Sequence, residues 1–445
     1  MSGGSVGTTP GAEVTSLETW THQIGRVPTW MKVLLGWVVF LGLLWWRGGP
    51  TIRDDHVILY SAWMMAHGGF DCAYRVPAPA RDYPLSAPLF SLLNSGLQWL
   101  TRVGFSRPFP LHALSAGGCH HDYAVVNGWL RGTTTARRTL WLGTFVWPLL
   151  ATSCISLVRA RRQKVALLEW ILVGALALWP TWSLPFLEYY HPEDVLALAA
   201  LLASLASAER ARPALAGVFA GLAFLSQQNV ALGVVVVFVM LTTRREWWRF
   251  LRASALTAAL VVVPLVTLSG FGALHAALTG TGLNDNPVYS TWMGELGIYG
   301  NHALLISRAG PLLLGALGLW WWLDRVGRPS PHLVLDLLAC TFALRLVLEE
   351  NLWSYYSLGL VTCWLVVDLR EGRRRVVPWM WALVVSGLPW LSSWPLVSAL
   401  PVARAPLWMW QAVLLPLAVL VSARPLWNEV RSRRGVDETV VVTPR

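Results

Sequence analysis

The sequence contains few charged residues. Only 13% of its 445 residues are Asp, Glu, Lys or Arg, whereas a soluble domain usually carries about 25%. Hydrophobic residues make up 55%, and the mean hydropathy is +0.49. Apolar runs of about 20 residues, the length needed to cross a bilayer, recur along the chain. We therefore predict one integral, all-α polytopic membrane domain in a lipid bilayer, and we exclude a string of soluble domains.

Lysine is also scarce, so the net charge of +11 rests almost wholly on arginine. The basic residues fall in short loops, which is the positive-inside pattern of membrane proteins and not a nucleic-acid surface. With so much Ala, Val, Leu and Gly, this composition indicates a GC-rich bacterial genome, and hence a bacterial plasma membrane. Residues 1–20 are polar and lack a basic start, so we expect no cleavable signal peptide and a disordered cytoplasmic segment over residues 1–30.

About twelve spans are expected within a membrane domain over residues 31–422. They are Met31–Trp46 and, by number, 139–157, 165–183, 192–208, 213–226, 228–243, 250–269, 302–322, 331–348, 353–369, 376–393 and 405–422. The pair 213–226 and 228–243 is short enough to form a single tilted span. A single span would put its two basic flanks on opposite faces, so two are favoured. A cytoplasmic tail over 423–445 is expected to be disordered from Arg431.

Charge also predicts the orientation of the chain. Five basic stretches lie on one side in this count, which is cytoplasmic by the positive-inside rule: 159–164, 209–212, 244–252, 324–328 and 370–375. The acidic residues and most histidines collect on the opposite face. This favours a functional site on the extracytoplasmic side, and the alternative is that acidic residues are simply tolerated there.

The first extracytoplasmic loop, 47–138, is too long to be only a connector. An amphipathic helix is predicted over 56–67, directly after Asp54 and Asp55. A second is predicted over 84–100, with Pro84 in its first turn and with leucines at helical spacing: Leu85, Leu89, Leu92, Leu93, Leu97 and Leu100. We expect both helices to lie on the membrane surface.

Four stretches carry a resemblance to a known family. They are "PTIRDDHVILYSAWMMAHGGFDCAY" (50–74), "EYYHPEDVLALAALLA" (188–203), "AGVFAGLAFLSQQNVALGVVVV" (216–237) and "LRLVLEENLWSYYSLGL" (344–360). In this order the chain resembles the GT-C glycosyltransferases, closest to the polyprenyl-phosphate-mannose-dependent mannosyltransferases of actinobacteria known as glycosyltransferase family 87. Two features depart from the family pattern. Ser226 stands where relatives often have a basic residue, and the first loop is long between Arg102 and Arg138, with an unusual "GGCHHDY" (117–123).

The resemblance implies a GT-C-like fold and an inverting sugar transfer at the extracytoplasmic face. The donor is a polyprenyl-phosphate sugar, with mannose as the family default, and the acceptor is a glycolipid or glycan. No cofactor is implied. Asp54 or Asp55 would be the general base, because a carboxylate must accept the acceptor's proton. The family's spacing favours Asp54, and the alternative is that one of the pair only caps the helix.

Cationic side chains are needed where the lipid phosphate leaves. Arg345 and Arg308 are the main candidates, since a charge inside an apolar span is costly without a function or a partner. The alternative is that Arg345 only forms an ion pair with Glu349, which follows one helical turn later. Further candidates for substrate binding are His191, Glu193, Asp194, Gln227, Gln228, His302, Glu349 and Tyr356. A helix that begins at Pro192 explains Glu193 and Asp194 equally well, because acidic residues are favoured in the first turn of a helix.

Cysteine and metal ligands complete the predictions. Cys72 and Cys119 both lie in the first loop, where an oxidising compartment permits a disulfide between them. No metal site is predicted, because the ligands of "CHHD" (119–122) are poorly spaced and no second cluster completes a tetrahedral set.

Three other functions remain open from sequence. The first is a lipid or glycan transporter or flippase, although no internal repeat is apparent and the polar residues gather at the outer boundary instead of the midplane. The second is a lipid-linked glycan polymerase or ligase, or an arabinosyltransferase, which only the site can separate from a mannosyltransferase. The third is a scaffold for envelope assembly, which would not need paired carboxylates.

Overall fold

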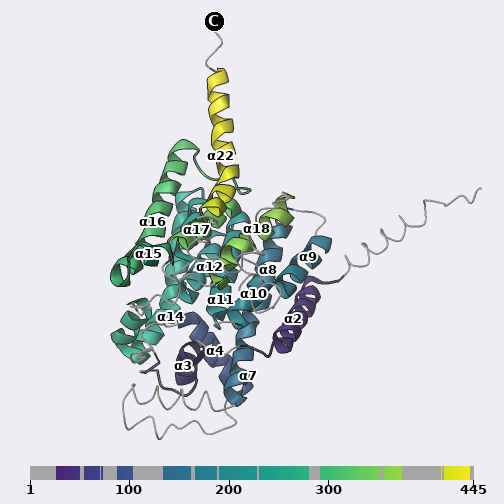
Figure 1. The fold of residues 1–445 in the computed structure, drawn as a ribbon, viewed down its shortest axis with the longest axis vertical. Coiled ribbons are helices and arrows are strands. Elements are labelled where there is room, and N and C mark those ends of the chain that lie inside the picture. Colours follow the sequence, from purple (N-terminus) through teal and green to yellow (C-terminus); the bar gives the residue numbers. More distant parts are fainter. Residues whose placement is uncertain are drawn as a thin grey trace, which may run out of the picture.

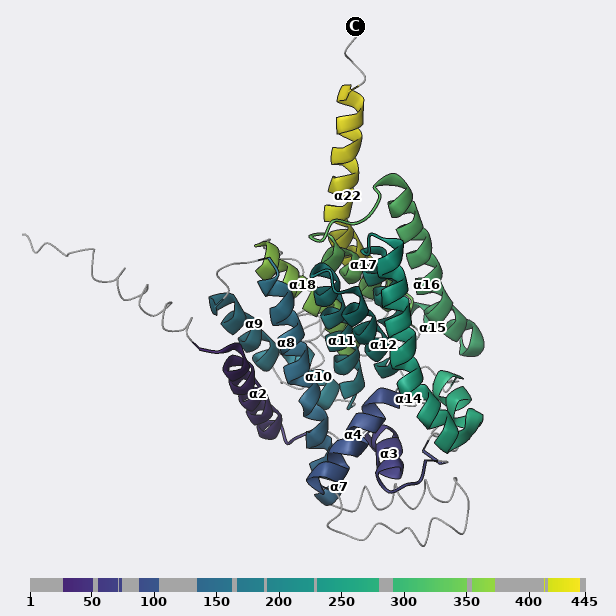
Figure 2. The ribbon, with the colours of Figure 1, turned by 180° about the vertical axis from the view of Figure 1, so that it is seen from behind.

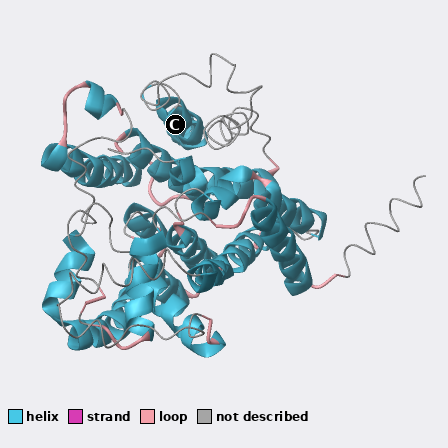
Figure 3. Ribbon diagram, turned by 60° about the horizontal axis from the view of Figure 1, so that its bottom comes forward, coloured by secondary structure: helices cyan, strands magenta, loops and turns pink. Residues whose placement is uncertain are grey.

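The computed structural model describes residues 27–50, 55–70, 72–73, 88–103, 134–161, 166–187, 190–227, 230–279, 291–349, 354–372, 412 and 415–440. Within these ranges every regular element is a helix (Figures 1 and 3). Four helical stretches are long and apolar enough to cross a membrane: Thr29–Trp46, Arg138–Arg159, Ala166–Leu187 and Arg244–Leu268. The chain is thus a helical protein with membrane-spanning character, while the count of about twelve spans stays a prediction.

The helices follow the predicted order. In the first loop they are α3 (Asp55–Ala66), α4 (Pro88–Thr101) and α7 (Thr134–Leu142). The others are α2 (Thr29–Trp46), η2 (Gly143–Phe145), α8 (Val146–Arg159), α9 (Ala166–Leu178), α10 (Pro180–Leu187), α11 (Pro192–Glu209), α12 (Pro213–Ser226), α13 (Ala231–Val239), α14 (Arg244–Thr279), α15 (Trp292–Glu295), α16 (Gly300–Arg325), α17 (Val334–Val347), η4 (Ser354–Ser357), α18 (Leu358–Glu371) and α22 (Leu415–Val440).

Helix α11 lies at the centre of the bundle, packed between α8 and α12. Its side chains are buried on nearly every side, as expected of a helix that is apolar all round. Small residues let the neighbouring helices approach closely. At Gly217 of α12 an added Cβ would collide with the backbone carbonyl of Phe250 in α14, so this contact requires glycine.

One of the predicted spans is interrupted. The stretch predicted over 165–183 forms α9 and α10, which meet at Trp179 just before Pro180. Helices α12 and α13 are separate, and Gln227 between them has extended backbone (φ −163°, ψ 131°), so the chain does not form one continuous helix there. Helix α14 is broken at Gly270, whose φ of 76° only glycine adopts readily.

The carboxy-terminal tail differs from the prediction. We expected disorder from Arg431, but α22 continues to Val440. The physical reason lies one turn earlier, where Leu426 and Val430 are buried against Trp322, Val326 and Leu333. The composition of the tail could not reveal this contact, because the apolar partners are distant in the sequence.

Helix α4 divides the leucines of its predicted apolar stripe. Leu89 is buried, whereas Leu93 and Leu100 are exposed. Beside Leu89 and Phe90, the buried residues of this helix are polar: Ser91, Asn94, Ser95 and Gln98. Such an inverted distribution suits a helix whose outer face meets lipid and whose inner face meets protein, since lipid accepts apolar side chains as readily as a core does.

The bundle has two chemically different ends. We call one the basic end and define it by Arg159, Arg210 and Arg370. Arg370 lies 2.8 Å from Glu209 and 3.1 Å from the carbonyl oxygen of Pro331, and Arg210 lies 2.9 Å from that of Ser156. Segments predicted to lie in the cytoplasm therefore meet in space.

We call the opposite end the aromatic end and define it by Tyr190, His191, Tyr355 and Tyr356. Tyr190 is joined to Leu140 of α7 by a hydrogen bond of 3.0 Å. Helices α3, α4 and α7 lie together at this end, and α22 extends from the other (Figures 1 and 2).

Candidate functional site

The segment before α11 is held in an uncommon backbone conformation. Tyr190 has a φ of 55°, which is rare for a bulky side chain. Its fully buried ring fixes the segment, because the hydroxyl donates to the carbonyl oxygen of Leu140. An added Cβ at Gly143 would collide with this hydroxyl, so η2 and the segment must be in close contact. Strain maintained by surrounding contacts is typical of functional sites.

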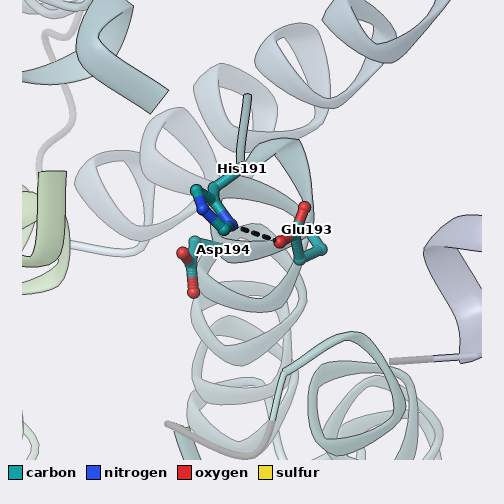
Figure 4. Close-up of side chains that lie close together, drawn as sticks. All are labelled: His191, Glu193 and Asp194. Atoms are coloured by element: carbon teal, nitrogen blue, oxygen red, sulfur yellow. Dashed lines mark hydrogen bonds and ion pairs between the residues drawn. The ribbon is translucent and has the colours of Figure 1, made fainter. Parts of the chain in front are cut away.

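His191 follows at the start of α11 and makes two contacts. Its Nδ1 lies 2.7 Å from Oε1 of Glu193 (Figure 4), and its ring stacks on Tyr355 with centroids 4.7 Å apart and an interplanar angle of 17°. Both His191 and Glu193 are buried. The stacking joins α11 to η4, two elements that are far apart in the sequence.

Arg345 extends the same cluster from α17. Its guanidinium lies over the ring of Tyr356, 4.8 Å from the centroid, and Tyr356 meets Tyr355 edge-on at 4.8 Å. Arg345 Nη2 also lies 3.0 Å from Oε2 of Glu349, so the ion pair that sequence analysis held as the alternative is present. A continuous set of contacts thus runs from His191 through two tyrosines to Arg345 and Glu349.

The cluster keeps some access to solvent. The side chains of Arg345 and Glu349 are 15% and 12% exposed, and Asp194 is half-buried. An arginine in this setting can meet an anion with its planar fork while one nitrogen holds a carboxylate. The arrangement therefore combines a cation, carboxylates and aromatic faces, which is a set that binds phosphate and sugar groups.

Sequence reasoning missed a second polar feature at this end. Gln98 Nε2 donates to Asn94 Oδ1 at 2.7 Å, and both side chains are fully buried. The Nδ2 atom of Asn94 and the Oε1 atom of Gln98 have no hydrogen-bond partner among the described residues. The signal that could have found this pair is its spacing, since residues four apart share one face of a helix.

Several predicted site residues lie elsewhere or outside the described ranges. Asp54, Gln228 and Cys119 are outside them, and Asp55 begins α3 but its side chain is not described. Gln227 follows the end of α12. Arg308 and His302 are exposed on α16, and the contacts that define the cluster do not include them.

The cysteines divide into two groups. Cys72 is disulfide-bonded, while Cys154, Cys340 and Cys363 are free. The predicted partner of Cys72, Cys119, lies outside the described residues, so the pairing itself stays a prediction.

A histidine that follows α3 has an altered pKa. His67 follows α3, stacks on Trp63 at 5.1 Å, and has its Nδ1 3.0 Å from the Trp63 carbonyl oxygen. Burial lowers the pKa of His67, and the hydrogen bond to the backbone only partly opposes this. The ring is therefore neutral at physiological pH.

Comparison of the chain with protein-family models, with curated proteins and with solved structures finds no match. The described geometry and the motifs in the sequence therefore carry the functional argument.

Proposed function

We propose that this chain is a membrane glycosyltransferase that moves a sugar, with mannose as the first candidate, from a polyprenyl-phosphate donor to a glycolipid or glycan acceptor at the extracytoplasmic face. The observation that carries the proposal is the meeting of two resemblance stretches, 188–203 and 344–360. His191 of the first stacks on Tyr355 of the second, and Arg345 lies over the neighbouring tyrosine. If the motifs that carry the resemblance build one site, these two stretches must contact each other in the fold.

In the proposed reaction the acceptor's hydroxyl oxygen attacks the anomeric carbon of the sugar. The bond between that carbon and the phosphate oxygen breaks, and the polyprenyl phosphate leaves with the bonding electrons. Asp54 or Asp55 takes the proton from the attacking hydroxyl. Attack from the side opposite the leaving group inverts the anomeric configuration.

Arg345 has the features that the departing phosphate needs. A cation placed where negative charge develops stabilises the transition state more than the bound substrate. The guanidinium reaches the phosphate with nitrogens other than the one facing Glu349, and the face of Tyr356 limits its rotation. Glu349 keeps the group oriented when no donor is bound.

The buried amides of α4 support the same function. Asn94 and Gln98 each present a hydrogen-bonding atom that has no partner among the described residues. Sugar hydroxyls both donate and accept hydrogen bonds, so they match a carboxamide pair. We assign this pair to binding of the sugar or the acceptor.

The test is sugar transfer in proteoliposomes that contain the purified chain, a labelled polyprenyl-phosphate-mannose and a glycolipid extract. We expect wild type to transfer label. Asp54→Asn or Asp55→Asn should lower the rate by roughly 100-fold or more, as loss of a general base does. Arg345→Gln should lower it by about 100-fold. Arg325→Gln is the matched control for the loss of one arginine, because Arg325 is exposed in the last turn of α16 and outside the cluster. Arg308→Gln tests the second predicted phosphate ligand separately.

The outcomes separate the candidate functions. If wild type transfers sugar and both aspartate variants transfer it equally well, neither aspartate is the general base. No transfer by wild type overturns the proposal for this donor. Movement of the labelled lipid between leaflets without transfer would favour the flippase alternative.

A further inference from the structure

The first turns of α14 carry arginines and a tryptophan on one side of the helix. These residues follow one another at spacings of three or four positions and are Arg245, Trp248, Arg249 and Arg252. Residues at such spacings are neighbours on the surface of a helix. Each of them is exposed, and together we call them the arginine face. The proposed transferase site uses none of them.

The arginine face lies at the basic end of the bundle. An added Cβ at Gly217 of α12 would meet Phe250 of α14. One turn later, an added Cβ at Gly221 would meet Ser254, so the two helices run in the same direction and pack closely. Helix α12 begins close after Arg210 of the basic end, and α14 therefore begins there too.

Further along α14 the same face becomes apolar. Leu256, Leu260 and Val263 continue the helical spacing, and their side chains are exposed. They belong to the stretch Arg244–Leu268, which is long and apolar enough to cross a membrane. Exposed apolar side chains of a membrane span face the acyl chains of lipids. The arginine face, closer to the end of this span, then lies at the level of the lipid headgroups.

In the part of the chain that the structure describes, no carboxylate forms an ion pair with the arginine face. The acid within this stretch, Glu246, caps the helix, because its Oε2 accepts hydrogen bonds from the backbone N–H groups of Thr242 and Thr243 at 2.7 Å and 3.0 Å. Arg252 lies over the ring of Trp248, with its guanidinium carbon 6.0 Å from the centroid. This contact turns the charge back toward the start of the helix, as expected of an arginine that reaches from an apolar face to the headgroups.

We propose that the arginine face binds the phosphate groups of anionic phospholipids in the membrane leaflet at the basic end. A guanidinium matches a phosphate with two parallel hydrogen bonds and stays charged at physiological pH. Basic residues clustered beside a membrane span favour anionic over neutral lipids. A second copy of the chain is a poorer occupant, because a symmetric dimer through this face would oppose arginine to arginine. The inference does not rest on the proposed transferase function.

The experiment measures lipid binding to the purified full-length chain in detergent by native mass spectrometry. Dioleoyl phosphatidylglycerol is titrated, and dioleoyl phosphatidylcholine, which has the same acyl chains and no net charge, is the control lipid. We expect saturable phosphatidylglycerol adducts on wild type and about 10-fold weaker binding of phosphatidylcholine. The triple variant Arg245→Gln, Arg249→Gln and Arg252→Gln should weaken phosphatidylglycerol binding by about 10–100-fold, since each arginine beside an anionic lipid contributes roughly 5-fold.

Helix α22 offers a matched control for a single arginine. Arg431 lies over Trp427, with its guanidinium carbon 5.6 Å from the centroid, much as Arg252 lies over Trp248. Arg252→Gln should weaken phosphatidylglycerol binding by about 5-fold. Arg431→Gln removes the same kind of contact outside the arginine face, and binding should stay within about 2-fold of wild type.

A triple lysine variant of the arginine face separates lost charge from lost folding. It keeps the positive charges, so it should bind phosphatidylglycerol within about 5-fold of wild type. A loss as large as that of the glutamine variant would overturn the proposal. So would equal phosphatidylglycerol affinity of wild type and the glutamine variant, or equal affinity of wild type for the two lipids. A wild-type dimer that the glutamine variant converts to monomer, with lipid binding unchanged, would assign the face to a second copy and also overturn it.

Discussion

The two ends of the bundle use charge in opposite ways. At the basic end each of these buried ions faces one of opposite charge: Lys32 lies 2.8 Å from Glu169, and Arg370 lies 2.8 Å from Glu209. Even there the carboxylate oxygens of Glu209 make no hydrogen bond among the described residues, so the contrast lies in the facing charges. At the aromatic end Arg345 and Glu349 stay partly exposed, and Glu193 keeps an oxygen without a partner among the described residues. A buried charge matched by its neighbour holds a structure together, whereas an incompletely matched one is prepared to bind something else.

The predicted positive-inside topology would explain why the charges separate in this way. In that topology the basic loops stay in the cytoplasm, and glutamates from the chain's own helices face them, as Glu209 faces Arg370. The glutamates of the aromatic end have fewer cations to meet. If the proposed function is right, stability and substrate binding are separated at opposite ends of the bundle, and variants at the two ends can test this.

The largest expected effect is on stability at the basic end. Arg370→Met should lower the free energy of unfolding by about 3–5 kcal/mol, because Glu209 would be left buried without its cation. Thermal or denaturant unfolding in detergent measures this. The double variant Arg370→Met with Glu209→Leu should recover most of the loss. Equal instability of the single and double variants would mean that the pair does more than neutralise charge.

The second effect concerns the polar face of α4. Asn94→Ala should cost about 1–3 kcal/mol, since the buried amide of Gln98 loses its one described partner. Replacing both side chains, as Asn94→Leu with Gln98→Met, should cost less, because no polar group stays unpaired. The same double variant should transfer sugar poorly. Normal transfer by a stable double variant would remove this pair from the proposed site.

The third effect should separate function from stability at the aromatic end. Arg345→Gln should lower the free energy of unfolding by only about 1 kcal/mol, because Glu349 is partly exposed and can be hydrated when left alone. Sugar transfer should nevertheless fall by about 100-fold. A loss of stability as large as that of Arg370→Met would contradict the comparison between the two ends.

Sequence reasoning recovered the parts of this architecture that depend on local patterns. The helix over 56–67 follows from its start signal after Asp54 and Asp55, and α3 matches it within a residue at each end. The pairing of Arg345 with Glu349 follows from helical spacing. The contact between Arg345 and Tyr356 crosses from one helix to the next and has no such local signal.

What the sequence could not predict has a physical cause. Leucine spacing predicted an amphipathic helix on the membrane surface, but lipid and protein interior both accept leucine, so periodicity alone could not tell which side chains of α4 turn inward. The amides of Asn94 and Gln98 are the better indicator, because only the inner face can satisfy them. His191, Glu193 and Asp194 were predicted to bind substrate, with a helix start at Pro192 as an equal explanation for the acidic pair. The stacking of His191 on Tyr355 has no local signal in the sequence and comes only from the fold.

The smallest expected effect is the pH dependence contributed by His67. Burial lowers the pKa of this histidine in the folded chain below its ordinary value of 6.5. The unfolded chain therefore binds the proton first as pH falls, so this stabilising contribution is complete above pH 6.5 and is lost as pH drops from there toward the folded pKa. His67→Phe should keep the stacking on Trp63 and remove this part of the acid sensitivity. Unfolding of wild type and variant between about pH 5 and 8 measures it, and parallel curves would show that protonation of His67 does not contribute to the acid sensitivity.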